Sequence, residues 1–436
     1  MPSQSQMRSL FGLPLELREQ IYESVLLTSK DDFQLLQTCR AIHDEAYQFL
    51  FKRPLTFKSQ GALLRWAKSV GTEHLHYVTT MTLCLVDVDQ SAPASQQEID
   101  HSSTDIEWGA YERELQAIST IMTRLPNIKA LSLTSPRIIR PSKLFLEFEN
   151  HVLNTLGQHF ANLMSLAWYG DHQSMQFVAS LHNLRSLRFT GFAQSSPHEL
   201  AKILSGLHHL HDIQIGPCSF ETTHGSRIPP TGSCHIGRSF TSNLLEHINN
   251  LRSISFHECA LWSDAPYTFF TKDYIDAVKH HHNHSIQSVK INLDFPPTAD
   301  SLAALQDLLF RSSVTHFGIG WPGMDPELLS VLMFPALELL EVYTDSPRST
   351  VRIMQLISRQ RTRAPNLKRL MLIIRPPVLS VRESEQVPIA STTNTKDGHR
   401  RDSHSETQRD TVCPNLEEMR EELSLLGIQA FHVQSV

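Results

Sequence analysis

The stretch LRSLRF, residues 184–189, contains the pattern that decides the fold, because its apolar residues have a fixed spacing. Leu184 is followed three positions later by Leu187, and two positions after that by Phe189. Residues two apart lie on the same face of a β-strand, so Leu187 and Phe189 are expected to point into a core together. Leu184 then fills the corner before the strand. The stretch therefore predicts a short strand with one buried face.

The same three-point pattern returns along most of the chain. Clear copies are IKALSL, LMSLAW, LHDIQI, LRSISF, IQSVKI, VTHFGI, LELLEV and LKRLML, and fainter ones are VTTMTL from Val78 and IQAFHV from Ile428. Between the copies lie stretches with helical apolar spacing, such as SMQFVASL, SPHELAKILSGL and SLAALQDLLF. Strands that alternate with helical returns predict an α/β strand-helix solenoid. A β-propeller or a doubly wound sheet is the competing fold, but neither accounts for so many copies with helical returns.

This pattern resembles the leucine-rich repeat, whose units are about 20 to 29 residues long. Several intervals here are longer and no ladder of asparagines is visible, so we expect an irregular, curved member. The residue between the two strand anchors points outward, and these residues form a row on the concave sheet. The row comprises Ser132, Ala167, Arg188, Gln214, Ser255, Lys290, Gly318, Glu341 and Met371.

The outward row is mixed in character, neither basic nor apolar. Any one of its residues can simply be solvated, because exposed polar side chains need no partner. As a row on a concave sheet, however, it is the expected place for a protein partner. We predict that Arg188, Gln214, Lys290 and Glu341 bind that partner.

A different kind of segment precedes the repeats. LPLELREQIYESVL, residues 13–26, begins with a proline suited to a first helical turn and carries Glu16 and Glu19 near the helix amino end. Its apolar residues recur at three- and four-residue steps. A second amphipathic helix, or a closely joined pair, is expected from near Asp31 to Phe51. Two short helices bury little surface alone, so part of their apolar face needs another chain or the next domain.

LPLELREQIYESVL followed by LLQTCRAIHDEAYQFLF resembles the F-box, and more narrowly the fungal F-box-like sequences built on Leu-Pro-x-Glu-Leu-Arg and Cys-Arg-x-Ile. This resemblance implies a helical motif that binds the Skp-type adaptor of a cullin-RING ubiquitin ligase. The rest of the chain then captures the protein to be ubiquitinated. On the matching positions, the residues implied in adaptor binding, by direct contact or by packing the helices, are Leu13, Pro14, Leu17, Ile21, Leu35, Leu36 and Cys39.

The segment departs from the family where many F-boxes have a basic residue and a Trp after Cys-Arg. Here His43, Asp44 and Glu45 change the charge of the second helix. The alternative role for both helices is to cap the exposed end of the repeats, as terminal units of solenoids do. The two roles are compatible, because a cap also has an outer face.

The expected organisation has five parts. They are a flexible amino terminus at 1–12, an F-box-like helical domain at 13–57, an irregular leucine-rich-repeat-like domain at 58–379, a disordered insertion at 380–412, and a terminal helix and strand at 413–436. Polar, breaker-rich sequence also predicts a disordered insertion at about 89–107 and a long loop at about 216–240 inside the repeat domain.

Residue types that bind zinc occur in the loop, but their spacing matches no known finger. Cys218, His224, Cys234 and His235 are followed by His257 and Cys259, and the adjacent Cys234 and His235 are poorly placed to share one tetrahedral ion. The histidine run 280–284 ends an expected helix, where the helix dipole and solvent account for it. We therefore expect no metal and no cofactor.

The sequence contains no Walker-type loop, no dinucleotide glycine fingerprint, no nucleophile elbow and no zincin helix, so we expect no enzymatic activity. A net charge of −6 offers no general attraction to nucleic acid or to anionic lipid. The apolar runs are too short to span a bilayer, and six scattered cysteines favour an intracellular setting, cytoplasm or nucleus. Two functions remain: a substrate-recognition subunit of a Skp-cullin-F-box ligase, or a repeat scaffold for protein interactions that meets no ligase.

Overall fold

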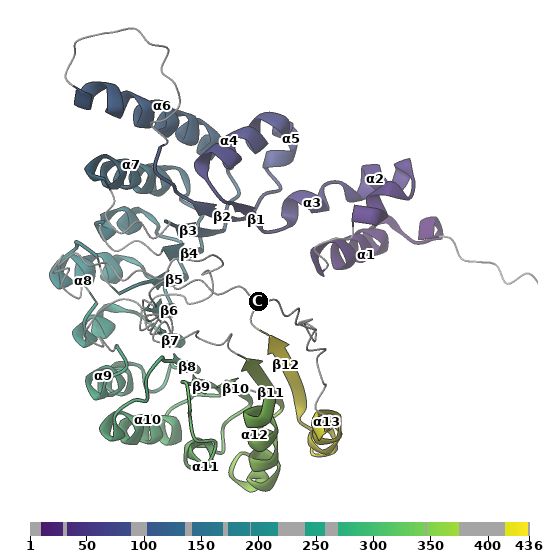
Figure 1. Ribbon diagram of the computed structural model, residues 1–436, viewed down its shortest axis with the longest axis vertical. Helices are drawn as coiled ribbons and strands as arrows, with labels where there is room; N and C mark the ends of the chain where they lie inside the picture. The colour runs from purple at the N-terminus through teal and green to yellow at the C-terminus, as the bar shows by residue number, and fades with distance from the viewer. Residues whose placement is uncertain are drawn as a thin grey trace, which may run out of the picture. The chain divides into compact units, whose positions relative to one another are not determined.

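The computed structural model describes residues 10–28, 33–88, 103–135, 142–168, 173–191, 193–216, 240–257, 269–344, 347–374 and 415–434 (Figure 1). The chain divides into two compact units, Met1–Ile286 and Gln287–Val436. The predicted insertion at 380–412, most of the one at 89–107 and most of the loop at 216–240 lie outside the described residues.

The first unit begins with short helices. They are η1 Leu10–Gly12, α1 Leu15–Thr28, η2 Phe33–Gln37, α2 Arg40–Ala46 and α3 Phe49–Lys52, where η marks a 3-10 helix. Pro14 lies just before α1, and its carbonyl accepts the amide hydrogens of Leu17 and Arg18 at 3.1 and 3.2 Å. The second predicted helix is thus broken into η2, α2 and α3, which agrees with a closely joined set more than with one continuous helix.

Seven parallel strands follow in the first unit, each paired with the next along the chain as far as β7. They are β1 Leu55–Phe57, β2 Thr80–Cys84, β3 Ala130–Thr134, β4 Ser165–Trp168, β5 Ser186–Phe189, β6 Asp212–Ile215 and β7 Ser253–His257. The strand at 55–57 was assigned from sequence to the helical domain, yet it pairs with β2. All the repeat copies of this part of the chain are confirmed as strands.

Helices connect these strands and lie on one side of them (Figure 1). They are α4 Gln60–Ser69, α5 Thr72–Leu75, α6 Ser103–Thr123, α7 Lys143–His159, η3 Met175–Ser180, α8 Pro197–Gly206, η5 Ser242–His247 and α9 Lys272–His282. Local sequence explains α8: Ser196 and Glu199 form a capping box around Pro197 in the first turn. SMQFVASL contains the 3-10 helix η3, because Leu163 and Leu184 are only 21 positions apart and leave little room for an α-helix.

Apolar anchors at the three pattern positions form the core of the repeats. In the repeat that contains β5, Leu184, Leu187 and Phe189 are each 0% exposed. At most of the described corners one backbone carbonyl accepts two amide hydrogens from the next repeat: the Lys129 carbonyl accepts from Met164 and Ser165 at 2.8 and 2.9 Å. This shared geometry fixes the strand register from repeat to repeat.

Asparagines also link the corners, although no ladder of asparagines was expected from the sequence. The side-chain amide of Asn127 donates to the His76 carbonyl at 2.7 Å, and that of Asn183 donates to the Ala161 carbonyl at 2.9 Å. Asn366 makes the equivalent bond to Pro335 in the second unit, at 3.0 Å. These asparagines precede the corner residue rather than follow the strand, so they differ from the ladder that the leucine-rich-repeat pattern would place.

The second unit repeats the architecture with five parallel strands, β8 Ser288–Asn292, β9 His316–Gly320, β10 Leu339–Thr344, β11 Arg369–Ile374 and β12 Gln429–Gln434. Its helices are α10 Ala299–Arg311, α11 Leu328–Leu332, α12 Pro347–Arg359, η7 Arg361–Arg363 and α13 Asn415–Leu425. Both units therefore have an α/β architecture of irregular leucine-rich-repeat-like strand-helix repeats. In the first unit the amino-terminal helices precede these repeats.

The register of the last strand differs from the prediction. The pattern IQAFHV places Phe431 among the inward anchors, but Phe431 pairs with the outward Met371 while Ala430 pairs with the inward Leu370. Phe431 is accordingly 47% exposed. A shift of one residue reverses the face of every side chain in a strand. The predicted copy is thus a strand, but in the wrong register.

Candidate interaction surfaces

The amino-terminal helices contain a small core of their own. Its buried members all come from α1, η2, α2 and α3, and Leu10, Leu35 and Leu50 pack partly buried against them. The buried members are Tyr22, Leu26, Leu36, Ile42, Ala46 and Phe49. The face of α1 that carries Tyr22 and Leu26 is therefore covered by the following short helices.

A charged clamp holds α1 to α2. The guanidinium of Arg18 donates to both carboxylate oxygens of Glu45, at 2.9 and 2.7 Å, and the Tyr22 hydroxyl donates to Glu45 at 2.9 Å. Arg18 also donates to the Leu13 carbonyl at 2.7 Å, which fixes the chain before the helix. The hydrogen bonds from Arg18 lower the pKa of Glu45 below its ordinary value of 4.5. Glu45, where the segment departs from the F-box pattern, thus has a structural partner inside the segment.

Beside the covered face, α1 and Leu13 just before it present apolar side chains that are open. Leu13, Leu17 and Ile21 recur every four residues and are 37%, 44% and 38% exposed. We call these three residues the amino-terminal apolar face. Of the twelve large apolar side chains that are exposed among the described residues, six fall between Phe11 and Leu27. The concentration matters because single exposed leucines are common, whereas clusters of them mark interaction sites.

The other residues implied in adaptor binding lie in different environments. Pro14 and Cys39 are exposed, and Cys39 precedes α2 as its N-cap. Leu35 is half-buried against the small core. Leu36 is buried inside it, at 9% exposure, so it packs the helices together and does not lie on the surface. Leu36 is therefore placed as a helix-packing residue, and Leu35 lies beside it with a different orientation because adjacent residues of a 3-10 turn point to different sides.

Contacts also join these helices to the first repeat. The ring of His74 in α5 stacks on Phe51 of α3, with centroids 4.9 Å apart, and meets Tyr47 edge-on at 5.0 Å. Phe51 belongs to α3 and Tyr47 to the turn before it, so both lie far in the sequence from the amino-terminal apolar face. The segment thus contacts the repeats through one end and leaves Leu13, Leu17 and Ile21 open.

The outward row is confirmed by the strand register in each unit. In the first unit Ser132, Ala167, Arg188, Gln214 and Ser255 pair in sequence across β3 to β7. Arg188 is exposed and Gln214 half-buried, whereas Ala167 and Ser255 are buried. Arg188 and Gln214 therefore remain the accessible members among the predicted partner-binding residues of this unit.

In the second unit two charged residues of the outward row pair with each other. Lys290, Gly318 and Glu341 occupy equivalent positions on β8, β9 and β10. Because Gly318 has no side chain, the Lys290 ammonium reaches across it to the Glu341 carboxylate at 2.8 Å. Glu341 is 6% exposed. Each charge is thus paired with the other, and the partner-binding role of Lys290 and Glu341 stays a prediction.

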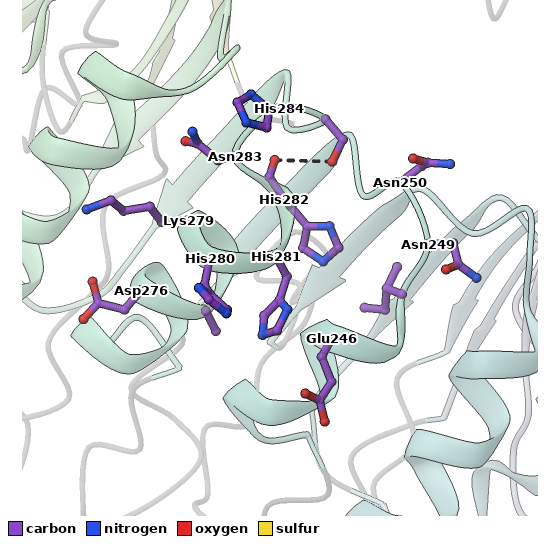
Figure 2. A pocket seen from close by; sticks show the side chains of 13 residues that line it. Glu246, Asn249, Asn250, Asp276, Lys279, His280, His281, His282, Asn283 and His284 are labelled. Carbon is purple, nitrogen blue, oxygen red and sulfur yellow. Dashed lines mark hydrogen bonds between the residues drawn. The ribbon is translucent and has the colours of Figure 1, made fainter.

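A hollow of about 1040 Å³ lies at the ends of η5 and α9 (Figure 2). The histidine run predicted to end a helix lines it: the rings of His280 and His281 lie beside each other, with centroids 4.7 Å apart. His282 is buried and its Nε2 bonds the Leu245 carbonyl at 2.8 Å, which ties α9 to η5. Burial lowers the pKa of His282. One member of the run is thus a core residue, while its neighbours are exposed.

Within the described part of the chain, no three His, Cys, Asp or Glu side chains are placed to hold a metal ion. Of the six residues weighed as zinc ligands, His257 is described and is buried at the end of β7, while the others lie outside the described residues. No helix among the described residues has the length and apolar character needed to cross a bilayer.

Neither a protein-family model nor a curated protein sequence matches the chain. Among solved structures, the leucine-rich repeat-containing protein LegL7 from Legionella pneumophila aligns with 59% of this chain and 87% of its own, at 14% identity and a TM-score of 0.33. The Rad7 and Elc1 complex of yeast aligns with 83% of this chain and 90% of the other, at 12% identity and a TM-score of 0.35. TM-scores of this size do not establish a common fold, so the assignment of the fold rests on the strand register.

Proposed function

We propose that this chain is a non-catalytic substrate-recognition subunit of a Skp-cullin-F-box ubiquitin ligase. In this proposal the amino-terminal helices bind the Skp-type adaptor, and the repeats bind the protein to be ubiquitinated. The observation that carries it is the amino-terminal apolar face: Leu13, Leu17 and Ile21 are open although the same helices have their own core. A helix that presents residues at four-residue steps suits a groove on a partner.

The energy available from this face fits a docking contact. Completely burying a leucine or isoleucine stabilises by about 1.5 to 3 kcal/mol, so covering side chains that are about 40% exposed contributes roughly 1 kcal/mol each. Leu13, Leu17 and Ile21 together then supply roughly 3 kcal/mol, or about a hundredfold in affinity. Pro14 and Cys39 are exposed as well and can extend the contact.

The repeats would act by holding a target, with all bond-making chemistry in other subunits. Holding a substrate beside a reactive centre raises its effective concentration, which requires no catalytic residue in this chain. The outward row of the first unit, with Arg188 exposed on β5, is the surface proposed to meet the target. Such a role belongs in the cytoplasm or the nucleus.

Co-purification tests the proposal. The intact chain and a Leu17→Asp, Ile21→Asp double variant are each tagged, and a Skp-type adaptor is sought in the eluate. We expect the adaptor with the intact chain and its loss with the double variant. Leu425→Asp is the matched control, because Leu425 is 89% exposed on α13 and a charge there should leave the adaptor bound.

Adaptor binding, together with the folding state of the double variant, distinguishes the ligase proposal from the alternative scaffold function. The contacts of His74 with Phe51 and Tyr47 favour a capping role, in which the helices serve only to cover the first repeat. If the intact chain binds no adaptor, or if the double variant binds it as well as the intact chain, the ligase proposal fails. An unchanged circular dichroism spectrum and melting temperature show that loss of the adaptor is not loss of the fold.

A further inference from the structure

A groove follows the corners of the repeats at the amino ends of β3 to β6. It has a volume of about 300 Å³ and is lined by the residues just before and just after the first anchor of each repeat. Three asparagines, Asn127, Asn162 and Asn183, precede the anchors, and Lys129, Met164 and Arg185 follow them. His209 ends the groove. None of these residues belongs to the outward row or to the amino-terminal helices.

The backbone of the groove is rigidly defined. The Lys129 carbonyl accepts two amide hydrogens from the next repeat, and the Met164 carbonyl accepts those of Arg185 and Ser186 at 2.8 and 3.0 Å. Asn127 and Asn183 each bond a carbonyl of the preceding repeat through their side-chain amides. Because neighbouring strands are about 4.8 Å apart, Lys129 and Arg185, two strands apart, emerge about 10 Å from each other.

The charges in this groove are of one sign. Lys129 and Arg185 are exposed, and neither has an ion-pair partner among the residues that the structure describes. No aspartate or glutamate lines the groove. Asn162 adds a side-chain amide to the lining, and Met164 belongs to the repeat between those of the two cations. Such a groove attracts an anion and offers hydrogen-bond donors to it.

The equivalent edge of the second unit is different. There the residues that follow the anchors are Gln287, Thr315, Glu338 and Lys368. Lys368 pairs with Glu338 at 3.1 Å, so its charge is satisfied within the edge. The unpaired cations of the first unit are thus not a general consequence of the repeat.

We propose that this groove binds a short acidic peptide segment of a partner protein, with Lys129 and Arg185 each pairing with one anionic group. A peptide in the polyproline II conformation rises about 3.1 Å per residue and presents every third residue on the same face, so two anionic residues three positions apart match the separation of the cations. The anionic groups are oxyanions, which carboxylates and a phosphorylated side chain both supply. A nucleic acid fits less well, because tracking its backbone requires a longer basic stripe than two cations on a chain of charge −6.

Fluorescence anisotropy with the full chain and labelled peptides tests the proposal. Three ten-residue probes in a Gly-Ser background differ only at two positions three residues apart: two glutamates, one phosphoserine with one glutamate, or two glutamines. We expect both acidic peptides to bind about tenfold or more tightly than the glutamine peptide, with affinity that falls as salt rises. Tighter binding of the phosphoserine peptide identifies phosphate as the preferred group, and equal binding shows that carboxylates are sufficient.

Two charge-reversal variants make the test specific. Lys129→Glu with Arg185→Glu should weaken the acidic peptides about tenfold or more, whereas Lys143→Glu with Lys202→Glu, on exposed positions of α7 and α8, should change binding less than about twofold. Lys129→Gln with Arg185→Gln repeats the test in case charge reversal disturbs folding. The proposal is overturned if neither acidic peptide binds at about 1 mM, if both double variants lose binding equally, or if a labelled ten-nucleotide single strand binds more tightly than either peptide.

Because the groove shares no residue with the amino-terminal helices, this test is independent of adaptor binding. If the chain binds the acidic peptides but binds no adaptor, the groove proposal is supported and the scaffold function remains. A chain that binds the adaptor but neither peptide refutes the groove alone.

Discussion

Leucine and isoleucine recur at regular steps both in the amino-terminal helices and in the repeats, yet their side chains lie in opposite environments. In the repeats Leu187 and Ile213 are 0% exposed, because the connecting helices lie on one side of the strands and cover the inward face (Figure 1). On α1, Leu17 is 44% exposed although Leu26 on the same helix is 0% exposed. The difference teaches that a repeat buries its anchors by stacking, whereas a terminal helical segment has one covered face and one open face.

The largest expected effect separates the two regions by stability. Ile213→Ala removes a completely buried anchor of β6 and should lower the free energy of unfolding by about 2 to 5 kcal/mol. Leu17→Ala removes an exposed side chain and should change it by less than about 0.5 kcal/mol. Urea unfolding followed by circular dichroism measures both. Equal losses of unfolding free energy in the two variants would show that Leu17 is buried and that the two regions do not differ in exposure.

A smaller, pH-dependent effect is expected inside the amino-terminal segment. The pKa of Glu45 is lowered by Arg18, so the clamp stabilises α1 and α2 most at pH values above the ordinary pKa of 4.5 and loses its contribution as pH falls through the lowered value. Glu45→Gln should therefore speed amide hydrogen exchange in α1 at pH 7. The difference in melting temperature between Glu45→Gln and the intact chain should become smaller as the pH is lowered.

A control variant and the pH dependence make this prediction specific to the clamp formed by Arg18 and Glu45. Asp44→Asn alters a neighbouring carboxylate that is 66% exposed in its side chain, and its weak contact with Arg40 at 3.9 Å should contribute little at any pH. A Glu45→Gln difference that stays constant between pH 7 and acid would contradict the role of the charged pair.

The smallest expected effect lies in the repeats. Asn183→Ala removes the bond from its side chain to the Ala161 carbonyl and should cost about 0.5 to 1.5 kcal/mol. Asn162→Ala is the comparison, because Asn162 forms no hydrogen bond with a described residue through its side chain and should cost less. Thermal melting of the two variants and the intact chain distinguishes the two asparagines, and equal melting temperatures would argue against a structural role for the Asn183 bond.

Much of the repeat fold follows from the sequence because its cause is local. Three apolar residues at fixed spacing place two anchors on one face of a strand, and that rule predicted the strands at Leu131, Leu187 and Ile254. The register of the last strand could not be read in the same way. IQAFHV matches the pattern at Phe431 and Val433, but pairing with β11 sets the register one residue away.

The candidate surfaces were predicted less completely, because they depend on contacts between residues distant in the sequence. Nothing in the local sequence indicates that Lys290 reaches Glu341 across Gly318, since the three residues lie on successive strands. Asparagines did leave a signal in the sequence: Asn127, Asn162, Asn183, Asn250 and Asn366 each directly precede a corner anchor. The bonds of Asn127, Asn183 and Asn366 to the preceding repeat became evident only in three dimensions.

Thiol labelling tests most directly whether the amino-terminal apolar face is open and is covered by a second protein. Leu17→Cys and Leu26→Cys are each made in a background with the native cysteines replaced, and their reaction with a maleimide is followed with and without a Skp-type adaptor. We predict fast labelling of Leu17→Cys in the isolated chain, at least about tenfold slower labelling with the adaptor, and slow labelling of Leu26→Cys in both. Slow labelling of Leu17→Cys in the isolated chain, or a rate that the adaptor leaves unchanged, would contradict the account.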